Sequence, residues 1–197
     1  AIYSGTAGIV TVMFALRKTM GFEQYITKLH FDNLGKLLLV LSLIWTYING
    51  IELFTAWYSG TSEEYEALGY KLFGYYAWLY WEMILFCAVA PMLMFSTRFR
   101  TSFVPMLILS IAINIGMYTE RFLIVATSLS RQYLPDAWGT YVPSPVEISI
   151  MVGSFALFTT LFLIFVKIFP SVSMYEVKET MATPKMEPAA PAAGSPA

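Results

Sequence analysis

Long apolar segments constrain this chain more than any other feature. Four of them, at residues 34–58, 73–96, 103–127 and 146–169, are long enough to cross about 30 Å of hydrocarbon at about 1.5 Å per helical residue. The composition agrees, because 57% of residues are hydrophobic, 13% are charged and the mean hydropathy is +0.62. We therefore expect an all-α membrane protein, folded as a multi-span bundle of transmembrane helices.

The two ends of the chain differ from these segments. Residues 1–16 are apolar but short, and no initiator Met, basic leader or cleavage-site pattern marks them as a signal peptide. They predict a partial transmembrane helix, the fifth span and the first in order, within a longer protein. Residues 34–169 predict a four-helix transmembrane bundle, and the Pro/Ala-rich residues 170–197 predict a cytoplasmic tail without a core.

The loop charges predict the orientation in the membrane, since short cytoplasmic loops collect Lys and Arg. Lys71 and Arg131 are the two basic residues on one side, where acidic residues are frequent. The other side should be cytoplasmic and should hold the C-terminus. It carries nine basic residues: Arg17, Lys18, Lys28, Lys36, Arg98, Arg100, Lys167, Lys178 and Lys185.

The outer loop "YLPDAWGTYVPSP", residues 133–145, combines three prolines with large amphipathic rings. Such a loop has restricted φ angles and favours the membrane interface. It fits an aromatic belt that anchors helix ends, and equally a docking platform for an extracytoplasmic partner. Asp136, Trp138 and Tyr141 are the candidate docking residues.

Charged residues inside the spans form a layer. Glu52, Glu82, Glu120 and Arg121 all lie about 9 to 14 Å below the outer ends of their predicted helices, at about 1.5 Å per residue. Each would cost about 2.5 to 3.5 kcal/mol at a helix centre facing lipid. We therefore expect them to face inward and to find partners.

Helical geometry predicts how these charges pair. Glu120 and Arg121 diverge by about 100° on their helix, so Arg121 should pair with Glu52 or Glu82 from another span. A carboxylate left over could carry a proton. Structural glue between helices is the alternative role for the layer. The candidate proton route comprises Glu52, Glu82, Glu120, Arg121, Tyr118, Asn114 and Asn49.

Other functional classes find little support. A net charge of -1 without a basic block argues against nucleic acid. Cys87 stands alone in an apolar run and predicts a packing role, and His30 lacks a second ligand at metal spacing. We expect no metal or haem in this chain and identify no catalytic residue. The aromatic run at residues 73–82 predicts belt residues, with a groove for an isoprenoid tail as the alternative.

Three stretches resemble a known family. "FTAWYSG" (54–60), "SIAINIGMYTERFLI" (110–124) and the run at 133–179 resemble the C-terminal half of NrfD/PsrC-like integral membrane subunits. Within that family they are most similar to the ActC-type subunits of bacterial alternative complex III. The resemblance covers most of residues 1–179.

The resemblance implies a quinol oxidoreductase subunit of the bacterial inner membrane that belongs to an electron transport (respiratory) chain. Quinol, which we expect to be menaquinol, would be oxidised near the outer face as a substrate, with proton translocation as a further expectation. Electrons would pass to an extracytoplasmic ActB-like iron–sulfur subunit. Multihaem cytochrome c subunits and a second, ActF-like membrane subunit would complete the complex.

Three alternatives remain open. The chain could be a non-catalytic anchor for extracytoplasmic redox subunits, or the membrane subunit of a polysulfide- or DMSO-reductase-type molybdoenzyme. A small-molecule transporter is the third, although the paired broken helices expected of such folds are not evident in the sequence. Bound quinone in an intact complex would separate quinol oxidation from anchoring.

Overall fold

Helices build every regular element of the computed structural model, which describes residues 1–19, 28–130 and 139–168. Four helical stretches are long and apolar enough to cross a membrane: Lys28–Ser59, Ala77–Phe95, Phe103–Ser128 and Pro145–Ile168. The predicted all-α class and its membrane character are thus confirmed. The elements are α1 (Ile2–Thr19), α2 (Lys28–Ser59), α3 (Ser62–Phe73), α4 (Ala77–Ile84), the π turn η2 (Leu85–Val89), the 3-10 turn η3 (Ala90–Phe95), α5 (Thr97–Arg100), α6 (Phe103–Ser130) and α7 (Pro145–Ile168).

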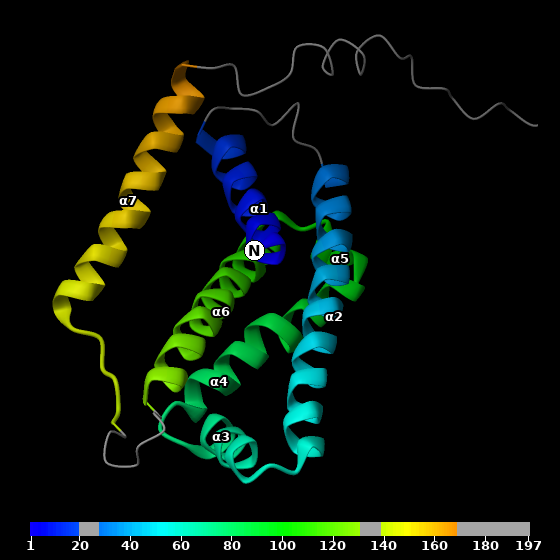
Figure 1. The fold of residues 1–197 in the computed structure, drawn as a ribbon. Helices are drawn as coiled ribbons and strands as arrows, with labels where there is room; N and C mark the ends of the chain where they lie inside the picture. The colour runs from blue at the N-terminus through cyan, green and yellow to red at the C-terminus, as the bar shows by residue number, and fades with distance from the viewer. Residues whose placement is uncertain (20–27, 131–138, 169–197) are drawn as a thin grey trace, which may run out of the picture. The chain divides into compact units, whose positions relative to one another are not determined.

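The chain divides into two units, residues 1–141 and 142–197. In the first unit α1 packs against α6 and α2, α4 packs against α6, and η3 packs against α2 (Figure 1). Apolar side chains from all of these elements are buried between them, whereas the outward faces of α2 and α6 expose large aliphatic residues such as Ile44 and Ile108. This inverted surface is what lipid contact requires. The buried core includes Val10, Phe31, Leu38, Tyr80, Met83, Met106 and Ile113.

The second candidate span is broken along its length. Pro91 has no N–H, so the carbonyl of Cys87, four residues earlier, lacks its usual helical donor. Two buried hydroxyls replace it, since Tyr3 Oη donates at 3.1 Å and Ser42 Oγ at 2.8 Å to that carbonyl. Within hydrocarbon every backbone group needs such a partner. The irregular turns η2 and η3 are therefore tied to α1 and α2 by hydrogen bonds.

Gly116 lets α6 approach this broken span closely. A Cβ at position 116 would lie 2.6 Å from Cys87 Sγ and 3.0 Å from Phe86 Cβ. The Cys87 thiol is free and buried in this contact. The packing role predicted for Cys87 is confirmed.

One predicted boundary is wrong. The sequence analysis begins the second span at residue 73, but Phe73 ends α3 and the span begins with α4 at Ala77. Gly60 separates α3 from α2 with a φ of 67°, a conformation that favours glycine. Hydropathy misses the break at residues 74–76 because Tyr75 and Tyr76 are themselves apolar enough to extend the run.

The second unit contains α7, which begins with a capping box. The Ser144 N–H donates to Glu147 Oε2 at 2.7 Å, and the Glu147 N–H donates to Ser144 Oγ at 3.3 Å. Pro145 occupies the first helical position, where its missing N–H has no cost. Whether α7 joins the others in one bundle over residues 34–169 stays a prediction, and residues 170–197 lie outside the described ranges.

Candidate functional site

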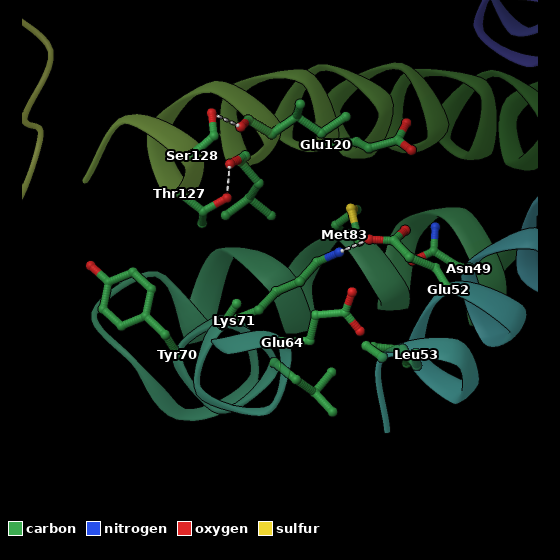
Figure 2. Close-up of a pocket in the computed structure, with 15 residues that line it drawn as sticks. Asn49, Glu52, Leu53, Glu64, Tyr70, Lys71, Met83, Glu120, Thr127 and Ser128 are labelled. Atoms are coloured by element: carbon green, nitrogen blue, oxygen red, sulfur yellow. Dashed lines mark hydrogen bonds and ion pairs between the residues drawn. The ribbon is translucent and has the colours of Figure 1, made fainter. Parts of the chain in front are cut away.

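A pocket of about 420 Å³ lies between the ends of α2 and α6 and the helices α3 and α4 (Figure 2). Gly60 turns the chain so that α3 follows the end of α2, which brings the polar residues of α3 to the apolar spans. The pocket is lined by Asn49, Glu52, Leu53, Ala56, Glu64, Ala67, Leu68, Tyr70, Lys71, Met83, Glu120, Leu123, Ile124, Thr127 and Ser128.

An ion pair joins α3 to α2 across the pocket. Lys71 Nζ, in the last turn of α3, lies 2.8 Å from Glu52 Oε1 (Figure 2). The ammonium also lies 5.4 Å from the centre of the Tyr80 ring, within the range of a cation–π contact. The Glu52 side chain is 61% exposed and that of Lys71 23%, so this is a surface pair that positions α3.

Glu120 presents one satisfied and one unsatisfied oxygen. Trp45 Nε1 donates to Glu120 Oε1 at 3.2 Å, which fixes the orientation of the carboxyl group. Glu120 Oε2 is buried and has no hydrogen-bond partner within the described ranges. Asn49 Oδ1 is in the same state, and Asn49 is 7% exposed. Buried polar atoms are paired in most proteins, so two open acceptors beside one pocket indicate that a donor belongs there.

The charges of the pocket do not balance. Glu52, Glu64 and Glu120 line it, and Lys71 is the lining cation. The acidic excess that the sequence predicts near the outer end of the spans is therefore present here. The rest of the wall is largely apolar, so the carboxylates stand at the edge of a hydrophobic cavity.

The structure brings together only part of the predicted polar layer. Glu52, Glu120 and Asn49 line the pocket, whereas Glu82 is half-buried on α4 outside it. Asn114 donates from Nδ2 to the carbonyl of Ser110 on its own helix at 3.0 Å, and Tyr118 is 45% exposed.

The predicted pairing of Arg121 is wrong. Glu52 pairs with Lys71, and neither Arg121 nor Glu82 makes an ion pair in the part of the chain that the structure covers. Arg121 is exposed on α6, because the buried stripe of that helix runs through Met117 and Thr119 to Leu123. Helical spacing showed that Glu120 and Arg121 diverge, but it did not show which of the two faces inward.

The candidate docking loop is covered in part. Asp136 and Trp138 lie outside the described residues. Tyr141 is held through its backbone, since Tyr76 Oη donates to the Tyr141 carbonyl at 2.7 Å and accepts from the Tyr141 N–H at 2.8 Å. The Tyr141 ring lies 6.1 Å from that of Phe122, centre to centre. These contacts fix the end of the loop against α6 and leave open whether it is a belt or a docking surface.

Sequence reasoning missed two residues of the site. Lys71 served only to set the orientation, although its spacing from the acidic start of residues 62–73 is that of an amphipathic helix. Trp45 lies four residues before Asn49 on the same face, and only the fold shows that its indole reaches Glu120.

The chemistry open to this site is hydrogen bonding and proton uptake. Across residues 1–19, 28–130 and 139–168, no group of three or more His, Cys, Asp or Glu side chains is placed to hold a metal ion. A carboxylate and a side-chain amide oxygen can accept hydrogen bonds from a guest, and the carboxylate can accept a proton.

Comparison with known proteins identifies the family. No match was found among curated proteins. Residues 1–131 match the family model described as "Polysulphide reductase, NrfD", a range that includes every residue of the pocket. The chain belongs to the NrfD polysulphide reductase family of membrane proteins.

Proposed function

We propose that this chain is a membrane subunit of a quinol oxidoreductase of the bacterial inner membrane, and that its pocket takes part in quinol oxidation near the outer face. The observation that carries the proposal is the unpartnered Glu120 Oε2, buried at the edge of a largely apolar pocket. Family membership supports it, because NrfD proteins are subunits of quinone-interacting redox complexes that include iron–sulfur partners.

Quinol oxidation releases two protons and two electrons, and the pocket residues can serve the protons. Trp45 holds Glu120 Oε1, so Oε2 is the atom that would accept a proton from a quinol hydroxyl. The Lys71–Glu52 pair holds α3 beside the same space. The electrons would leave to an extracytoplasmic iron–sulfur subunit. Release of the proton outward would couple oxidation to proton translocation.

The finer assignment is an ActC-type subunit of alternative complex III. It rests on the stretches at 54–60, 110–124 and 133–179, and its partners would be ActB-like, ActF-like and multihaem cytochrome c subunits. The membrane subunit of a polysulfide-reductase-type molybdoenzyme is equally consistent with the family model. In either assembly the role of a non-catalytic anchor is the competing function.

The test is Glu120→Gln in the intact complex. We expect full subunit content but quinol-dependent electron transfer slowed by about tenfold or more, since positioned proton acceptors contribute roughly 10²- to 10⁴-fold. Glu66→Gln, which removes the same charge from α3 outside the pocket lining, is the matched control and should retain the wild-type rate. An unchanged rate and pH profile in the Glu120 variant would leave the anchor function.

A further inference from the structure

The open polar atoms of the pocket are hydrogen-bond acceptors, while the donors of its lining that the structure pairs are already engaged. Asn49 Oδ1 and Glu120 Oε2 are open. Lys71 Nζ is held by Glu52 Oε1. The hydroxyls of Thr127 and Ser128 donate to backbone carbonyls of α6, at 2.6 Å and 2.8 Å.

The remaining walls suit an apolar body. Leu53, Met83 and Leu123 line the pocket beside the open acceptors. Ile124 also lines it and is 53% exposed, so the pocket reaches the apolar outer surface of α6. A volume of about 420 Å³ lies within the common range of roughly 300–1,000 Å³ for small-molecule sites. The guest therefore combines a flat or compact apolar body with hydrogen-bond donors.

We propose that the pocket binds the reduced, dihydroxy form of a quinone headgroup in preference to the oxidised form, with Asn49 Oδ1 and Glu120 Oε2 as the selecting acceptors. The inference rests on the proposed function, which supplies the quinone class of guest. A quinol hydroxyl donates to these atoms. The carbonyl oxygens of the oxidised quinone only accept, so they would face two acceptors without a proton between them.

Trp45 makes this selectivity open to reversal. Because the indole N–H donates to one oxygen of Glu120, the side chain of Glu120→Gln keeps its carbonyl oxygen toward Trp45. The amide nitrogen then takes the place of Oε2 and presents a donor to the pocket. The variant should therefore gain contact with oxidised quinone and lose contact with quinol.

The experiment uses diazirine-bearing 1,4-naphthoquinol and the matching 1,4-naphthoquinone as photolabels on the intact complex under anaerobic conditions. Labelled peptides are mapped by mass spectrometry. In the wild type, labelling at Met83 and residues 120–128 should be about tenfold stronger with the reduced probe, the size expected for a hydrogen bond to a charged group. Glu120→Gln should reverse the preference, and Asn49→Leu should weaken reduced-probe labelling alone. Glu66→Gln should match the wild type.

Equal labelling by both probes, or labelling confined to other peptides, would overturn the inference. Quinol-dependent electron transfer measured on the same preparation keeps this result separate from the proposed function. Turnover without redox-selective labelling of the pocket would refute the selectivity and leave quinol oxidation standing. Selective labelling without turnover would support the binding site and count against the oxidoreductase role.

Discussion

The pair formed by Glu52 and Lys71 shows how little a visible ion pair contributes when it is exposed. The Glu52 side chain is 61% exposed, so solvent screens its attraction to Lys71. Glu52→Gln should cost about 0–1 kcal/mol, which corresponds to a fall of less than about 4 °C in the melting temperature of a protein this size. Thermal unfolding in detergent checks this. A fall of 10 °C would mean that the pair is buried in the assembled protein.

Tyr76 is a second residue whose hydroxyl has a specific structural role. Tyr76→Phe removes both hydrogen bonds to the Tyr141 backbone and leaves a peptide N–H unsatisfied, at a local cost of about 1–3 kcal/mol. Hydrogen exchange at the Tyr141 amide should accelerate in the variant, while exchange in the core of α2 should not change. Equal exchange at Tyr141 in both proteins would show that other contacts hold this segment.

The same anchor should depend on pH. Burial raises the pKa of Tyr76 above its ordinary value, because it disfavours the phenolate. The neutral hydroxyl therefore stabilises the fold fully below the unfolded pKa of about 10, and this stabilisation is lost as pH rises toward the folded pKa. Wild-type protection at Tyr141 should decline above about pH 10.

At the residue scale the sequence predicted the acidic excess but not its pairing. A helical wheel places Glu120 and Arg121 on different faces, yet the rotation of α6 about its axis depends on packing against α1 and α4. Glu52 finds Lys71 because α3 lies next to the end of α2, and nothing in the span pattern indicated that helix.

Among the helices, the contact at Gly116 limits how α6 meets the second span. Gly116→Ala would place a Cβ 2.6 Å from Cys87 Sγ, so the helices must separate, at about 1–3 kcal/mol. We expect a lower melting temperature, with partial recovery in the double variant Gly116→Ala, Cys87→Ala, because the two residues touch and their effects are not additive.

The matched control is Gly153→Ala on α7, where a Cβ would meet nothing within 4 Å. That change should be neutral or stabilising by up to about 1 kcal/mol, given the higher helix propensity of Ala. Destabilisation of equal size at both positions would show that the close approach at Gly116 is not the cause.

Element boundaries followed hydropathy where the chain is uniformly apolar and failed where it is not. The third span was predicted at residues 103–127 and α6 begins at Phe103. The second span departs from a regular helix at η2 and η3, and Pro91 in the sequence was the signal for that break. The short helix α3 is amphipathic and lacks the length that a hydropathy search requires.

For the whole molecule, the orientation in the membrane stays a prediction from charge. Nine Lys and Arg residues on one side against two on the other place the C-terminus in the cytoplasm. A reporter fused after Ala197 should be active in the cytoplasm and shielded from protease added to intact cells. Cleavage of that tail from outside would reverse the orientation and put the pocket at the inner face.

The most direct test of the account is a high-resolution map of the intact complex prepared anaerobically with excess quinol. We expect headgroup density in the pocket, with one hydroxyl within hydrogen-bond distance of Glu120 Oε2 or Asn49 Oδ1, and loss of that density in Glu120→Gln. A pocket that holds only water, with quinol bound elsewhere in the complex, would contradict the account.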